Sequence, residues 1–155
     1  MRKLILLVTH AAALGVGGAL GIYLLPILTA PASPDAQTLQ EMARGASYRA
    51  QFSRDLKGSD FLHWGEGTVA VSPQRIVHMG ALAPGPDYKL YLVPDFAADE
   101  AEFLAQKAQS ARVGDVSGFG GAILDIPAGI DIEAYTTVVI WCEAVGEFIT
   151  AAKYR

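Results

Sequence analysis

The sequence predicts an all-β domain, an antiparallel sandwich or small barrel with a short helical insertion, preceded by an N-terminal transmembrane helix. The first 30 residues are almost free of charge, which is typical of a membrane span. Beyond residue 47, about seven short apolar segments alternate with turns, as in sandwiches and barrels. We therefore divide the chain into an anchor (1–30), a linker (31–47) and a β domain (48–155).

The N-terminal segment begins with Arg2 and Lys3, followed by an uncharged run of 27 residues from Leu4 to Ala30. As a helix this run would extend roughly 40 Å, and a bilayer core needs only about 20 residues. The alternative is a signal peptide, whose apolar core is about 7–15 residues; Ala30-Pro31-Ala32 loosely resembles its cleavage site. The length favours an uncleaved single-pass anchor.

The orientation of this anchor follows from its flanking charges. Positive residues stay in the cytoplasm, so the N-terminus is predicted to be cytoplasmic and the β domain extracytoplasmic, which in a bacterium means periplasmic. Within the span, Gly17 and Gly21 form a Gly-x-x-x-Gly pair. Such a pair lets two helices approach closely and suggests a helix-mediated homodimer, although glycine is also common in membrane helices without that role.

Composition excludes several functions. The chain carries a formal net charge of −4, and residues 31–155 hold 10 basic and 16 acidic side chains, which argues against nucleic-acid binding. The single cysteine excludes an internal disulfide, a zinc site built on paired cysteines and haem attachment through Cys-x-x-Cys-His.

After the proline-rich linker, residues 38–44 favour a short helix before Gly45. Short strands are then predicted at Tyr48–Arg54, Asp60–Trp64, Gly67–Val71, Arg75–Ala81, Tyr88–Val93, Ala122–Ile126 and Phe148–Tyr154.

Side-chain alternation indicates which residues of these strands face the core. It places Val69 and Val71 on one common face, and Leu90 and Leu92 on the inward face. Asp95–Ser110 interrupts the alternation, and its stretch Asp99–Lys107 has acidic residues first and a lysine last, which suits a helix dipole. One further helical turn is predicted at 132–135.

The strongest strand pattern is Tyr135–Val145, which contains the only cysteine. Alternation puts Val138, Ile140, Cys142 and Ala144 on one face, and the opposite face carries the charge of Glu143. We therefore expect Cys142 to face the core.

Three motifs occur in order along the chain: Phe61–Val69, Gly85-Pro86-Asp87 with the strand after it, and Val138–Cys142 followed by Phe148 and Ala151-Ala152. Together they resemble the DM-thirteen domain, also called the electron-transfer DM domain, over roughly residues 50–154, here in a bacterial, membrane-anchored member. The resemblance implies redox or electron transfer outside the cytoplasm, with a redox partner protein. It also implies that Cys142 acts as a free thiol or holds a bound group such as haem. The Asp95–Ser110 insertion is longer than the resemblance leads us to expect.

Two hypotheses for Cys142 stay open. Free cysteine is among the most buried residue types and often only packs. A reactive cysteine needs exposure and a neighbouring positive charge, but the adjacent Glu143 is negative. The domain is therefore either an electron-transfer module or a non-catalytic binding or scaffold module, rather than an enzyme with its own substrate.

The remaining ligand candidates are His63 and His78, the only histidines outside the anchor. Either is a tentative second ligand beside Cys142 if a haem is bound; the cofactor is otherwise unknown. A blue-copper site is excluded because no histidine or methionine follows Cys142, and we predict no metal site.

Overall fold

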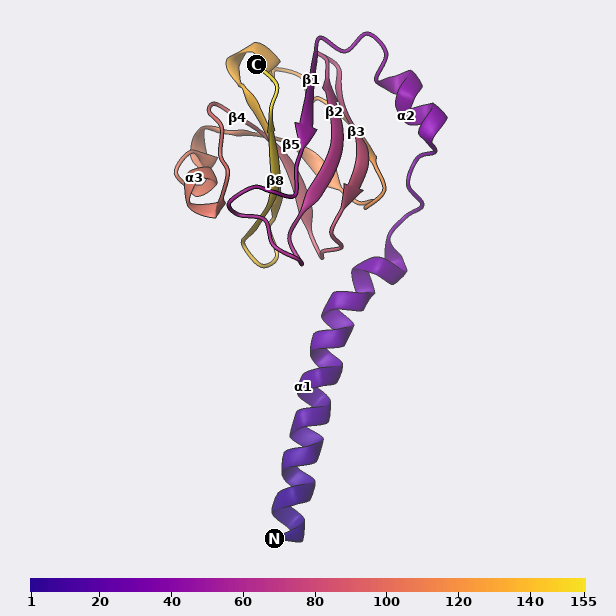
Figure 1. Cartoon of the computed structure of the whole chain (residues 1–155), viewed down its shortest axis with the longest axis vertical. Coiled ribbons are helices and arrows are strands. Elements are labelled where there is room, and N and C mark those ends of the chain that lie inside the picture. The colour runs from indigo at the N-terminus through magenta and orange to yellow at the C-terminus, as the bar shows by residue number, and fades with distance from the viewer.

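A computed structural model describes residues 1–155 as one long helix leading into a two-sheet β domain (Figure 1). The helix, α1 (Arg2–Thr29), has no buried residue and is long and apolar enough to cross a membrane, a test that a signal sequence also passes. Pro26 lies inside α1, and Figure 1 shows the last turn bending away from the axis of the rest. Proline explains this bend because it lacks the N–H that an interior helix position needs.

The β domain consists of two four-stranded sheets in which every pairing is antiparallel, so the predicted sandwich is confirmed. The first sheet has the order β1 (Tyr48–Phe52), β2 (Gly65–Val71), β3 (Arg75–Leu82) and β6 (Ala122–Asp125). The second has the order β5 (Ala111–Val116), β4 (Tyr88–Val93), β7 (Thr137–Cys142) and β8 (Glu147–Lys153).

The main core holds 20 buried residues and includes side chains from both sheets. Most of the residues that alternation placed together belong to this core: Val69, Val71, Leu90, Leu92, Val138, Ile140 and Cys142. Ala144, predicted on the inward face with Cys142, is instead exposed, because β7 ends at Cys142 and the chain turns there. Strand periodicity was therefore enough to orient β4, and β7 as far as Cys142, and to pair Val69 with Val71 on one face of β2.

Smaller apolar clusters cover the outer faces of both sheets. On the first sheet, Leu39 of α2 (Ala36–Met42) packs with Ala70 and Val77. On the second, the predicted insertion forms α3 (Glu100–Leu104) and η1 (Lys107–Gln109), and Phe103 packs with Val139 and Trp141. Both faces of β7 are therefore buried.

One predicted strand is absent from the structure, and one observed strand was not predicted. Asp60–Trp64 is a loop rather than a strand, because the Asp60 carboxylate accepts hydrogen bonds from the backbone N–H groups of Leu62 and His63, both at 2.7 Å. Strand β5 was not predicted because Gly114 and the charged Arg112 and Asp115 interrupt its apolar pattern. The turn predicted at 132–135 is present as η2 (Ile132–Ala134).

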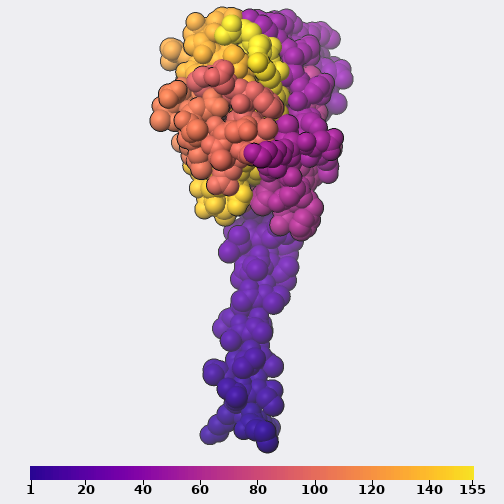
Figure 2. Space-filling model, turned by 60° about the vertical axis from the view of Figure 1, so that its left-hand side comes forward, coloured from indigo at the N-terminus to yellow at the C-terminus, as the bar shows by residue number.

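The strand directions give the domain two distinct ends. Loops 53–64, 83–87 and 117–121 and the turn 143–146 lie at the end that faces α1, and the β2–β3 turn and the C-terminus lie at the other (Figure 1). Figure 2 shows the domain as a compact head on the narrow stalk of α1. The end that faces α1 is the one that carries Cys142.

Candidate functional site

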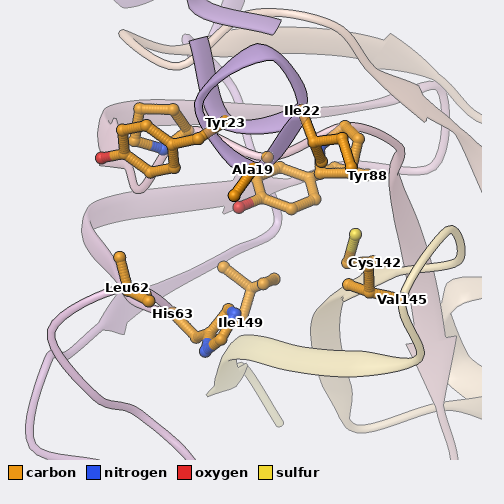
Figure 3. Close-up of a pocket in the computed structure, with 12 residues that line it drawn as sticks. Ala19, Ile22, Tyr23, Leu62, His63, Tyr88, Cys142, Val145 and Ile149 are labelled. Carbon is orange, nitrogen blue, oxygen red and sulfur yellow. The ribbon is translucent and has the colours of Figure 1, made fainter. Parts of the chain in front are cut away.

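A cavity of about 150 Å³ lies between α1 and the facing end of the domain (Figure 3). Most of its wall is apolar, and the residues come from elements that are distant in sequence. They are Ala19, Ile22 and Tyr23 of α1, Leu62, His63, Pro84, Gly85, Pro86 and Val145 of the loops, and Tyr88, Cys142 and Ile149 of β4, β7 and β8.

Cys142 is the last residue of β7 and has a free thiol on the wall of this cavity. Only 1% of its surface is exposed. Figure 3 shows its sulfur pointing toward the side of the cavity formed by Ile22 and Tyr88. Cys142 therefore occupies the end of the core, where the apolar interior meets the cavity.

The Gly-Pro-Asp turn, with the tyrosine that follows it, builds the wall beside Cys142. The Tyr88 hydroxyl donates to the carbonyl of Ala83 at 2.8 Å, and its ring lies so close to Gly85 that a Cβ there would be 2.3 Å from the hydroxyl oxygen. The carbonyl of Asp87 accepts from the N–H of Glu143 at 2.9 Å, which joins the turn to the end of β7. Burial raises the pKa of Tyr88, so its phenol stays neutral.

His63 is held on the same cavity by the loop that precedes β2. Its backbone N–H and its Nδ1 both contact the Asp60 carboxylate, the ring nitrogen at 3.1 Å. Burial raises the pKa of Asp60, but the hydrogen bonds from His63 and from the loop backbone outweigh it and keep the pKa below its usual value. The fold thus brings His63 and Cys142 to one cavity.

His78 does not line this cavity. It is 1% exposed in the first sheet, its Nε2 lies 2.9 Å from the carbonyl oxygen of Glu66, and its ring contacts that of Phe52 at a centroid distance of 5.2 Å. Burial lowers the pKa of His78, so the imidazole is neutral and Nε2 donates to the carbonyl. Its geometry is that of a packed core residue.

The cavity does not fit a haem. Pockets for drug-sized ligands occupy roughly 300–1,000 Å³, well above the volume here. Haem iron needs only one or two protein ligands, so it is the volume that decides against haem. For other metal ions, no three or more side chains of His, Cys, Asp and Glu come together as ligands. The cavity suits a small apolar group, and its wall has no lysine or arginine to stabilise a thiolate.

A polar cluster on the outer face of the second sheet lies directly behind Cys142. The Tyr91 hydroxyl donates to the Glu143 carboxylate, and Lys107 Nζ lies 2.8 Å from the same carboxylate and 5.0 Å from the Trp141 ring centroid. Burial raises the pKa of Tyr91 to about 12. Burial also raises the pKa of Glu143, but the hydrogen bonds from Lys107 and Tyr91 outweigh it and lower the pKa overall. This cluster ties the helical insertion to the end of β7.

Comparison with models of protein families matches residues 55–154 to a model described as "Electron transfer DM13". The chain belongs to the electron transfer DM13 family. The DM13 match includes every cavity residue except the three from α1, and the resemblance seen in the sequence motifs is thus confirmed. A comparison with curated proteins found no match, and a comparison with solved structures found none either.

The sequence pointed to Cys142 and His63 as candidate site residues, and both line this cavity. It did not point to Tyr88, Leu62, Val145 or Ile149, which also line it. The Gly-Pro-Asp motif was the available signal for Tyr88, because a tyrosine directly after a turn begins a strand at the edge of the loop layer. The loop residues gave no signal, since their meeting depends on tertiary packing.

Proposed function

We propose that this DM13 protein is a membrane-anchored electron-transfer module whose domain lies outside the cytoplasm and whose redox group is Cys142. The family description supports the activity, and the length and composition of α1 support the anchor. The observation that carries the assignment is the position of the thiol. Cys142 does not lie in the closed middle of the sandwich. It lines a cavity that α1 borders.

Access is what a redox thiol needs. A cysteine changes oxidation state when a peroxide converts it to sulfenic acid or when a partner disulfide exchanges with it, and both reactions require contact with the sulfur. The cavity offers that contact to small apolar reagents. His63, the one imidazole on the wall, is the residue we assign to accept the proton that the thiol loses.

A specific observation favours a second candidate, a binding or scaffold module in which Cys142 only packs. The residue is 1% exposed, belongs to the main core and has no cation on its cavity wall. In this case the task of the domain would be recognition of a protein partner by its loops, and the cysteine would contribute only to stability.

Thiol labelling of the full-length protein in detergent separates the two candidates. The redox module predicts that a small neutral maleimide modifies native Cys142, that a reduction potential is measurable by titration with thiol–disulfide buffers, and that Cys142→Ala abolishes both. His63→Gln should slow the labelling. A thiol that reacts only after denaturation, with no measurable potential, would support the binding module instead. An absorption spectrum taken on the same sample should show no Soret band.

The predicted homodimer fits the geometry of α1 but is independent of the redox assignment. At about 100° per residue, Gly17 and Gly21 lie on the face opposite Ala19, Ile22 and Tyr23, and no other side chain approaches within 4 Å of either glycine. A second copy can therefore pack on that face without displacing the domain. Cross-linking in membranes, compared between the wild type and Gly17→Leu, tests the pairing.

A further inference from the structure

The apolar side chains that the β domain exposes most lie at its α1-facing end. Phe61 is 86% exposed and Val145 is 56% exposed, the two highest values among the large hydrophobic residues beyond α1. Leu62, next to Phe61, is 38% exposed. These three residues, here called the loop-tip cluster, occupy the loop before β2 and the β7–β8 turn.

The position of α1 in a bilayer determines how close the loop-tip cluster lies to the membrane surface. Leu62 and Val145 line the same cavity as Ile22 and Tyr23 of α1 (Figure 3). If the hydrocarbon core begins near Leu4, its thickness of about 30 Å corresponds to about 20 residues and ends near Tyr23. Tyrosine is enriched at such boundaries. With this placement of α1, the loop tips are at the level of the outer membrane–water interface.

We infer that the loop-tip cluster inserts into the outer interface of the lipid bilayer, as a second membrane contact beside α1. This inference rests on the anchor in the proposed function but not on the redox role of Cys142. Moving exposed apolar side chains from water into the interface lowers the free energy of the system. The part of the chain beyond α1 is acidic, so the contact is apolar rather than a basic attraction to anionic lipid.

Tryptophan scanning of the full-length protein in phosphatidylcholine vesicles tests this contact. Phe61→Trp places the probe in the cluster, Gln74→Trp places a matched probe on the exposed β2–β3 turn at the opposite end, and Leu14→Trp places one in the middle of α1. Each variant is measured in plain lipid and in lipid brominated along the acyl chains, which quenches tryptophan on contact. Trp64 lies in the same loop as Phe61, so the wild type, which carries only the native Trp64 and Trp141, is measured in both lipids and its signal is subtracted from that of each variant.

We expect quenching and a blue-shifted emission for Phe61→Trp and Leu14→Trp, and neither for Gln74→Trp. Quenching of Leu14→Trp alone would overturn the loop contact and leave the anchor intact. Quenching of none of the three would overturn the anchor and the contact together. A blue shift of Phe61→Trp without quenching would show that protein, such as a second copy, covers the cluster instead of lipid, and would also overturn the inference.

Discussion

Tyr88 and Cys142 stand opposite each other in the ladder between β4 and β7, and both line the cavity beside α1. The position of the tyrosine ring is fixed by its hydrogen bond to Ala83 and by the absence of a side chain at Gly85. The surroundings of the thiol are therefore determined by a turn more than 50 residues earlier in the sequence, and changes in that turn should be felt at Cys142.

Gly85→Ala should disturb the cavity and destabilise the domain by about 1–3 kcal/mol, because the new methyl group forces the Tyr88 ring to move. Chemical unfolding in detergent measures the loss, and thiol labelling should change with it. The matched control is Gly114→Ala, whose methyl group would lie 3.4 Å from Leu124 in ordinary contact. Equal stability of the two variants would contradict the packing described for Gly85.

Cys142→Ser should lower the free energy of unfolding by about 1–3 kcal/mol, because it places a hydroxyl in a buried, mostly apolar site without a partner. Cys142→Ala serves as the control that removes the sulfur without adding a polar group. A serine variant as stable as the wild type would show that water reaches the cavity, in conflict with its apolar wall.

Phe103→Ala should cost about 3–5 kcal/mol, because Phe103 is fully buried and holds the helical insertion against Tyr91 and Trp141. Thermal unfolding measures the effect, and the fluorescence of Trp141 should shift to the red as the insertion loosens. Phe96→Ala, at a phenylalanine that is 41% exposed, is the matched control and should change both signals little.

The burial of His78 predicts a pH dependence of stability. Its pKa is lowered in the folded state, so the unfolded state binds the proton more readily as the pH falls below the ordinary value of about 6.5. The stability present above that pH is therefore lost as the pH falls through the folded-state pKa. The midpoint of thermal unfolding, measured between about pH 7.5 and 5, should decrease in the wild type and decrease less in His78→Gln. Parallel curves for the two proteins would contradict a buried neutral imidazole.

The sequence was informative where a local pattern determines the outcome. Alternation oriented Leu90 and Cys142 correctly because one face of each strand packs into the main core. It predicted a strand at Asp60–Trp64, where aromatic and apolar residues are frequent, because propensity does not include the carboxylate of Asp60 that folds the loop.

No local sequence pattern could predict the cavity. Leu62, Tyr88 and Val145 meet only through the pairing of both sheets and the placement of α1. The packing of Phe103 on Trp141 was equally hidden, because nothing in the pattern of the predicted helical insertion indicates that its Phe103 is buried. Both features depend on contacts between distant segments, which periodicity does not encode.

The link between α1 and α2 is short, residues 30–35, and it is itself fastened to the domain, since Ser33 accepts a hydrogen bond from the N–H of Gly120 at 3.0 Å. This hydrogen bond shortens the free length of the link and so restricts how far the domain can swing from α1. With α1 in a bilayer, encounters would be confined to lateral, two-dimensional diffusion. A partner that resides in the same membrane would then meet the Cys142 end of the domain at a constant height, whereas one arriving from bulk solvent would first meet the opposite end.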